Sequence, residues 1–88
     1  MEWQVFEARL LVRQLERAPR KVRGDYEFWK DQVRLYGPNL HGGFRTHSLR
    51  GERKGQRSAR LDRRWRVIFR VVEDGLIVEA LELTPHRY

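Results

Sequence analysis

Groups able to move a proton, together with many cations, stand in the second half of the chain. His47 opens a strongly basic stretch, and His86 and Tyr88 follow the last apolar segment. Histidine can give or accept a proton near neutral pH, and a tyrosine beside several cations is more easily ionised. Metal-free cleavage of RNA needs a base for the 2′-hydroxyl, an acid for the departing 5′-oxygen and cations around the phosphate. The residue types of this chain match those three needs.

The positive charge of the chain is concentrated in one region. Residues 45–70 contain ten Lys/Arg and two Asp/Glu, a net charge of +8 within a chain whose total is +7. Such a block repels itself unless a polyanion or an acidic protein lies against it, although it can also be a solvated surface that only aids solubility. The side chains that we expect to bind RNA phosphates are Arg50, Arg53, Lys54, Arg57, Arg60 and Arg66.

Other kinds of chemistry lack their usual residues. The chain has no cysteine, which excludes disulfides, thiolate nucleophiles and thiolate metal ligands. The basic block offers only Glu52 and Asp62 as oxygen ligands, so a two-metal nuclease site is not expected. No glycine-rich phosphate loop opens a helix, and no serine stands in a nucleophile elbow. We therefore expect neither a metal nor a cofactor.

The elements that must position these groups begin with a strand and two helices. A short strand is predicted at residues 3–6. Apolar residues then recur at three- and four-residue steps from Ala8 to Ala18, which predicts a helix that Pro19 ends. A second helix is predicted over Arg20–Tyr36, with one apolar stripe and a stop at Gly37. These two helices should form an antiparallel hairpin.

The second half of the chain has the alternation of strands. Residues 37–46 are rich in glycine and predict a loop. After it, Trp65, Val67 and Phe69 should face one way and the intervening arginines the other. Three antiparallel strands are predicted at residues 56–61, from Trp65 to Val72 and at 76–83, with turns at 62–64 and 73–75.

These elements predict one α+β domain spanning residues 1–88. A short N-terminal strand precedes a helical hairpin, which packs on one face of an antiparallel sheet of three to four strands. The other face should stay open and cationic, ready to hold a ligand. The N-terminal residues do not resemble a secretory signal and no stretch is long enough to span a bilayer, so we expect a cytoplasmic protein without membrane contact.

Residues 44–88 resemble the HigB-like branch of the RelE/ParE toxins. The resemblance rests on His47-Ser-Leu-Arg-Gly, on a Ser-Ala-Arg strand from Ser58, on Arg64-Trp-Arg-Val-Ile-Phe-Arg and on the ending Pro85-His-Arg-Tyr. The first 43 residues agree with that family only in the order of their elements. One detail departs from it, because Arg87 separates the histidine from the tyrosine, which are adjacent or reversed in many relatives.

The resemblance implies a function and roles for the residues. It implies a RelE-like fold and a bacterial toxin of a type II toxin–antitoxin system that enters the ribosomal A site and cleaves mRNA, leaving a 2′,3′-cyclic phosphate. A cognate antitoxin would silence it within a toxin–antitoxin hetero-oligomer. By position, His47 matches the residue thought to act as base and Arg66 the arginine that steadies the scissile phosphate. His86 and Tyr88 match the terminal pair, with His86 assigned as the acid.

Two other functions remain open on the same fold. A ParE-like gyrase inhibitor would bind without catalysis, but such relatives tend to lack the combination of histidine and tyrosine found here. A passive nucleic-acid-binding module would be expected to expose aromatic rings beside Arg66. The alternation instead directs Trp65 and Phe69 to the opposite face.

Overall fold

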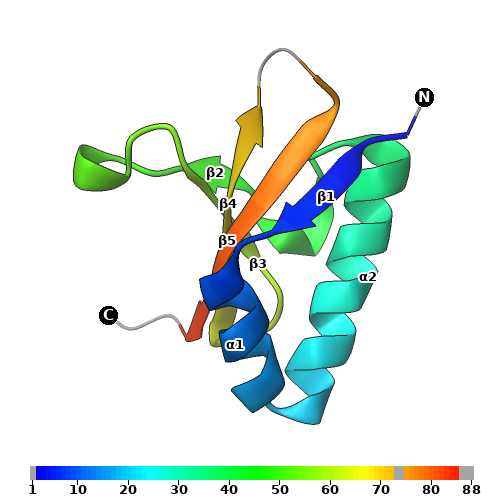
Figure 1. The fold of residues 1–88 in the computed structure, drawn as a ribbon, viewed down its shortest axis with the longest axis vertical. Helices are drawn as coiled ribbons and strands as arrows, with labels where there is room; N and C mark the ends of the chain where they lie inside the picture. Colours follow the sequence, from blue (N-terminus) through cyan, green and yellow to red (C-terminus); the bar gives the residue numbers. More distant parts are fainter. Residues whose placement is uncertain (1, 73–74, 86–88) are drawn as a thin grey trace.

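The computed structural model describes residues 2–72 and 75–85, whose two helices pack on one five-stranded sheet (Figure 1). The helices are α1 (Arg9–Arg17) and α2 (Arg20–Tyr36), and two single 3-10 turns are η1 (Gly42–Phe44) and η2 (Gly51–Arg53). The strands are β1 (Gln4–Glu7), β2 (His47–Ser48), β3 (Arg57–Arg60), β4 (Trp65–Val72) and β5 (Ile77–Pro85). The predicted α+β class is therefore confirmed.

The sheet differs from the prediction in its edges. Its order is β1-β5-β4-β3-β2, with β1 parallel to β5 and every other pair antiparallel. It is thus a mixed sheet of five strands, whereas an antiparallel sheet of three to four was predicted. The parallel pairing arises because β1 joins the sheet beside the last strand of the chain. The strand β2 is only two residues long, too short to give an alternating pattern.

Helix α2 buries the predicted apolar stripe. Val22, Tyr26, Trp29 and Val33 are each at most 2% exposed. Tyr36 continues the same spacing at the end of the helix but is 73% exposed, because the helix ends there at Gly37. Gly37 has φ +86°, a conformation that suits glycine, and a Cβ at this position would lie 2.9 Å from Nε1 of Trp3.

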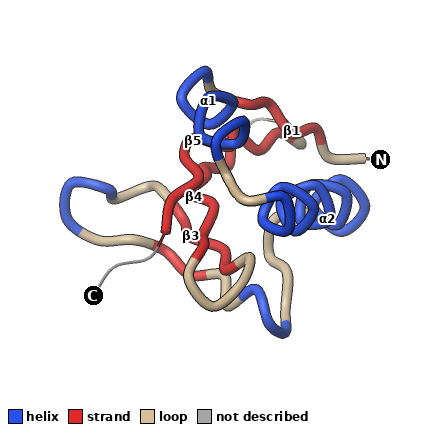
Figure 2. The backbone as a smooth tube through the Cα atoms, turned by 90° about the horizontal axis from the view of Figure 1, so that it is seen from below, coloured by secondary structure: helices blue, strands red, loops and turns tan. Residues whose placement is uncertain are grey.

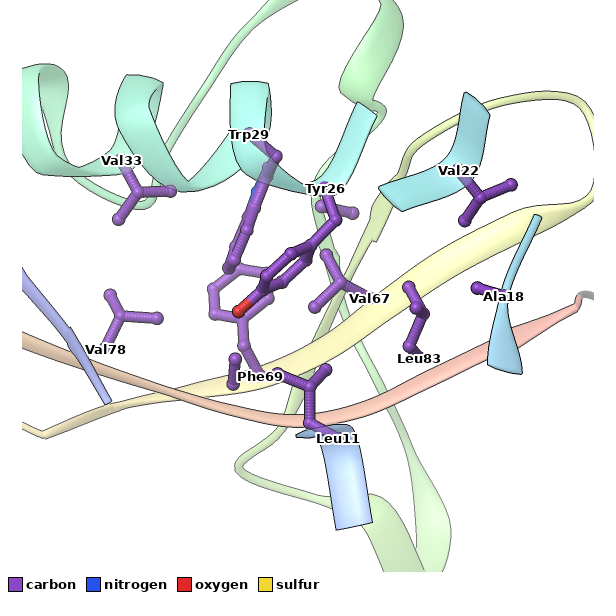
Figure 3. Close-up of a cluster of buried hydrophobic side chains, with 12 residues drawn as sticks. Leu11, Ala18, Val22, Tyr26, Trp29, Val33, Val67, Phe69, Val78 and Leu83 are labelled. Carbon is purple, nitrogen blue, oxygen red and sulfur yellow. The ribbon is translucent and has the colours of Figure 1, made fainter. Parts of the chain in front are cut away.

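The core lies between α2 and the sheet, with Leu11 of α1 closing it (Figure 3). The rings of Trp29 and Phe69 are 5.3 Å apart at their centroids. The hydroxyl of Tyr26 donates to a carboxylate oxygen of Glu7 at 2.7 Å, and burial, followed by this hydrogen bond, raises the pKa of Tyr26 well above its ordinary value. These contacts fix α2 to one face of the sheet.

The opposite face of the sheet is not covered by a helix. Figure 2 shows α2 on one side of β3, β4 and β5, and the segment that contains η2 on the other side. Val67 and Phe69 are fully buried toward the helices, as the alternation predicted. An irregularity follows Ile68, because Ile68 pairs with Glu82 while Phe69 pairs with Ala80, which leaves Leu81 without an opposite residue. The sheet therefore offers one face, modified by a β-bulge, for function.

Candidate active site

A row of four residues crosses the open face of the sheet from β2 to β5. His47 is paired with Ser58, Ser58 with Ile68, and Ile68 with Glu82. Directly opposite residues of paired strands share a face. In the adjacent row, one residue away on each of the three longer strands, Ala59, Val67 and Leu83 are buried in the core. The row therefore lies on the face away from α2.

A depression of about 270 Å³ lies over this row. It combines an imidazole, two guanidinium groups and a carboxylate, contributed by four separate elements. Its lining residues are His47, Leu49, Arg53, Ser58, Arg66, Ile68, Glu82, Thr84 and Pro85. The segment 49–56, which carries η2 and which we call the arm, projects from the sheet at the side of β2 (Figure 1). Because Leu49 and Arg53 line the depression, the arm forms one of its walls.

His47 is exposed and is oriented by the backbone just before it. Its Nδ1 lies 2.8 Å from the carbonyl oxygen of Arg45. A carbonyl only accepts hydrogen bonds, so this contact requires a proton on Nδ1 and leaves Nε2 to exchange a proton. Arg45 has φ +45°, the one non-glycine residue in the left-handed region among those described. The carbonyl that contacts His47 therefore belongs to a residue in an uncommon backbone conformation.

The arm is joined to β5 by an ion pair across the depression. Arg53 lies with its Nη2 2.9 Å from Oε2 of Glu82, and its Nη1 donates to Oε1 of Gln56 at 3.2 Å. Arg66 on β4 is half-buried and lines the same depression, opposite Thr84 on β5. Two predicted cations, one predicted histidine and one carboxylate that was not predicted therefore converge on a single site.

Two of the predicted phosphate-binding arginines, Arg57 and Arg60, belong to β3 but do not line this depression. Arg57 shares the core-side face with Ala59, and its Nη1 donates to Oδ1 of Asn39 at 2.6 Å. Arg60 donates from Nε to the carbonyl of Asp62 at 3.0 Å and lines a separate depression beside α2. Strand alternation separates Arg57 from Ser58, and the turn after β3 holds Arg60.

The remaining predicted site residues divide between the arm and the part of the chain that is not described. Arg50 and Lys54 are exposed on the arm, outside the lining of the depression. His86 and Tyr88 lie outside the described residues. Pro85, the last described residue, pairs with Trp65 and lines the depression.

The open face, predicted to be cationic, carries acidic as well as basic groups. Besides the pair of Arg53 and Glu82, the Nε of Arg70 donates to Oε1 of Glu79 at 2.6 Å. Both glutamates come from β5, so the last strand neutralises part of the charge that residues 45–70 bring.

Sequence reasoning missed Glu82 and Ser58. Strict alternation from the buried residues Val78 and Ala80 would direct Glu82 into the core, and only the bulge at Leu81 turns it to the open face. The sequence did contain one signal for Glu82, which stands between Leu81 and Leu83 at a position that alternation assigns to the core. Ser58 is 1% exposed, and its Oγ has no hydrogen-bond partner among the described residues.

Residues 2–72 and 75–85 contain neither a cluster of metal ligands nor a membrane-spanning helix. No three His, Asp or Glu side chains of this part gather as a metal site would require. Neither of its helices has the length and apolar character needed to cross a bilayer.

The sequence matches no family model and no curated protein, whereas the fold matches several solved toxins. A chain of the RelE–RelB complex from the archaeon Pyrococcus horikoshii is 25% identical, with a TM-score of 0.80 over 97% of this chain and 96% of that one. YafQ from E. coli gives a TM-score of 0.81 at 11% identity, covering 97% and 94%. The RelBE2 toxin–antitoxin complex from Mycobacterium tuberculosis gives 0.79 at 17% identity, covering 98% and 100%.

Proposed function

Since the chain has the fold of the RelE/ParE toxin superfamily, we propose that it is the toxin of a type II toxin–antitoxin system and cleaves mRNA on the ribosome. The structural neighbours support the first part, because RelBE2 from Mycobacterium tuberculosis and DinJ–YafQ from E. coli are solved as toxin–antitoxin complexes. The motifs of residues 44–88 support assignment to the HigB-like branch. The bacterial cytoplasm is the compartment in which such a toxin would meet translating ribosomes.

The observation that carries the catalytic part is the convergence of His47, Arg53 and Arg66 on one depression. In the proposed reaction the 2′-oxygen attacks the adjacent phosphorus and the 5′-oxygen departs, giving a 2′,3′-cyclic phosphate. His47 exchanges a proton through Nε2 while Nδ1 stays on the Arg45 carbonyl. Arg66 and Arg53 offset the charge that builds on the phosphate oxygens.

Further parts of the proposed site rest on position in the chain. His86 and Tyr88 follow Pro85, which lines the depression, by one and three residues, and this supports a role for both in proton transfer. Arg50 and Lys54 on the exposed arm are proposed to contact phosphates of mRNA or ribosomal RNA. A cognate antitoxin with an acidic segment is proposed to cover this surface when the toxin is silent.

Incubation with translating ribosomes and a defined mRNA tests the catalytic proposal. We expect fragments that appear only when ribosomes translate and that carry a 2′,3′-cyclic phosphate at the new 3′ end. The variants His47→Ala and Arg66→Ala, checked for folding by circular dichroism, should yield few fragments. Growth arrest with intact mRNA and inhibited gyrase would instead establish the ParE-like alternative. Intact mRNA together with normal DNA supercoiling would refute both.

Co-expression with the product of the adjacent gene tests the antitoxin proposal. We expect restored growth and co-purification of the two chains. Separation of the complex by charge substitutions at Arg50 and Lys54 would support contact with the arm. A neighbouring gene product that neither binds nor restores growth would contradict the proposed pairing.

A further inference from the structure

We propose that Glu82 is the general base that removes the 2′-hydroxyl proton, and that His47 then acts as the acid for the departing 5′-oxygen. This inference rests on the proposed function as a ribonuclease. It differs from the roles implied by the family resemblance, in which His47 is the base. The two residues lie at opposite ends of the row that crosses the open face, with Ser58 and Ile68 between them.

The distance along this row suits a reacting phosphate. Neighbouring strands lie about 4.7–4.9 Å apart, so the three steps from β2 to β5 separate the backbones of His47 and Glu82 by roughly 14 Å. Both side chains line the same depression, which leaves space for a phosphate group between them. In-line displacement requires the attacking and leaving oxygens on opposite sides of the phosphorus. A base and an acid at opposite ends of the depression meet that requirement.

The charges around Glu82 support a catalytic rather than a stabilising role. Its side chain is 23% exposed, and its ion-pair partner, Arg53, is 48% exposed. Ion pairs with this exposure contribute little to folding. A carboxylate within a site for RNA also repels the phosphate and lowers affinity. The carboxylate of Glu82, paired with Arg53 and lining the same depression as Arg66, has oxygens that can accept a proton from a bound hydroxyl.

The proposed step balances in protons and bonds. A carboxylate oxygen of Glu82 accepts the 2′-hydroxyl proton as the bond from the 2′-oxygen to phosphorus forms. The bond from phosphorus to the 5′-oxygen breaks, and that oxygen takes the proton from Nε2 of His47. The contact of Nδ1 with the Arg45 carbonyl orients the ring and leaves Nε2 as the nitrogen that exchanges the proton. Water then takes the proton from Glu82 and returns one to His47.

The sharpest test compares Glu82→Gln with Glu79→Gln. Glu79 lies on the same strand and the same face, is paired with Arg70 and has a side chain 32% exposed, so both variants remove one carboxylate and one surface ion pair. For Glu82→Gln, kcat on ribosome-bound mRNA should fall about 100- to 10 000-fold with KM unchanged or lower. Glu79→Gln should cleave at close to the wild-type rate.

The pH profile separates a base from a residue that only positions Arg53. Wild-type kcat/KM should fall on the acid side as the carboxylate becomes protonated, and Glu82→Gln should lose this limb. Arg53→Gln should also lower kcat, because Arg53 contacts the phosphate, but it should keep the limb, because the carboxylate remains. Loss of the limb in Arg53→Gln as well as in Glu82→Gln would show that Glu82 acts only by holding Arg53 and the arm, and would overturn the proposal.

The same series distinguishes the failure of this inference from the failure of the proposed function. Full activity in Glu82→Gln, with activity lost in His47→Ala and Arg66→Ala, would reject Glu82 as base and leave the ribonuclease intact. No cleavage by the wild-type protein would overturn both. Partial recovery in Glu82→Asp, relative to Glu82→Gln, is the further result expected of a base.

Discussion

Arg66→Gln and Arg57→Gln form a pair of equal charge change whose effects should differ greatly. Each variant lowers the formal net charge from +7 by one, and the two arginines stand on neighbouring strands of the sheet. Arg66 lines the depression with His47, whereas Arg57 lies on the core-side face and donates to Asn39. Any difference between the variants therefore reports position in the fold rather than overall charge.

The expected magnitudes follow from those surroundings. Removing one preorganised donor to a transition-state oxyanion typically lowers kcat by about 10²–10³, which corresponds to roughly 3–4 kcal/mol. We expect that loss for Arg66→Gln. Arg57→Gln removes a surface hydrogen bond, which contributes about 1 kcal/mol or less to the free energy of unfolding. Its kcat should stay close to that of the wild type.

The assay is the rate of mRNA cleavage on ribosomes at saturating substrate, with thermal unfolding to check that both variants fold. A salt titration of RNA binding adds a second comparison, because each phosphate contact that is lost should reduce the slope of affinity against salt by about one. Equal losses of kcat in both variants would refute the argument, because the overall positive charge would then matter more than the position of Arg66 in the depression.

Three further predictions concern the fold. Trp29→Ala removes a ring that is 0% exposed and should lower the free energy of unfolding by about 3–5 kcal/mol, measured by urea denaturation; a loss below about 1 kcal/mol would contradict the described core. Gly37→Ala forces a Cβ toward Trp3 at φ +86° and should cost about 1–3 kcal/mol in the same assay, whereas Gly24→Ala, with open space around it, should not destabilise. Burial raises the pKa of Asp62, but the backbone N–H groups of Arg64 and Trp65, with nearby cations, outweigh it and hold the pKa below the usual 3.8. The stability that ionised Asp62 contributes is therefore complete above about pH 4 and is lost as the pH falls through the lowered pKa. Asp62→Ala should destabilise the protein at pH 7 and differ less from the wild type at pH 2. A difference in the free energy of unfolding that grows in acid would contradict this.

Local periodicity was enough to predict the helices and the central strands. The steps between Val22, Tyr26, Trp29 and Val33 fix one face of α2, and the alternation of Val67 and Phe69 fixes the inner face of β4. Both patterns depend only on the geometry of a single element, so neighbouring residues in the chain carry all the information. The turn at residues 62–64 and the positive charge of residues 45–70 could also be predicted, because each depends only on residues close together in the chain.

The composition of the candidate site was decided by the tertiary structure. His47 and Arg66 were predicted from residue type, but the pairing of β2 with β3 and of β4 with β5 is what brings them to one depression with Glu82. One unpaired residue, Leu81, reverses which face the end of β5 presents. Side chains alternate between the two faces at every residue of a strand, so a single bulge moves the carboxylate of Glu82 from the core face to the site. The local sequence pattern does not predict this bulge.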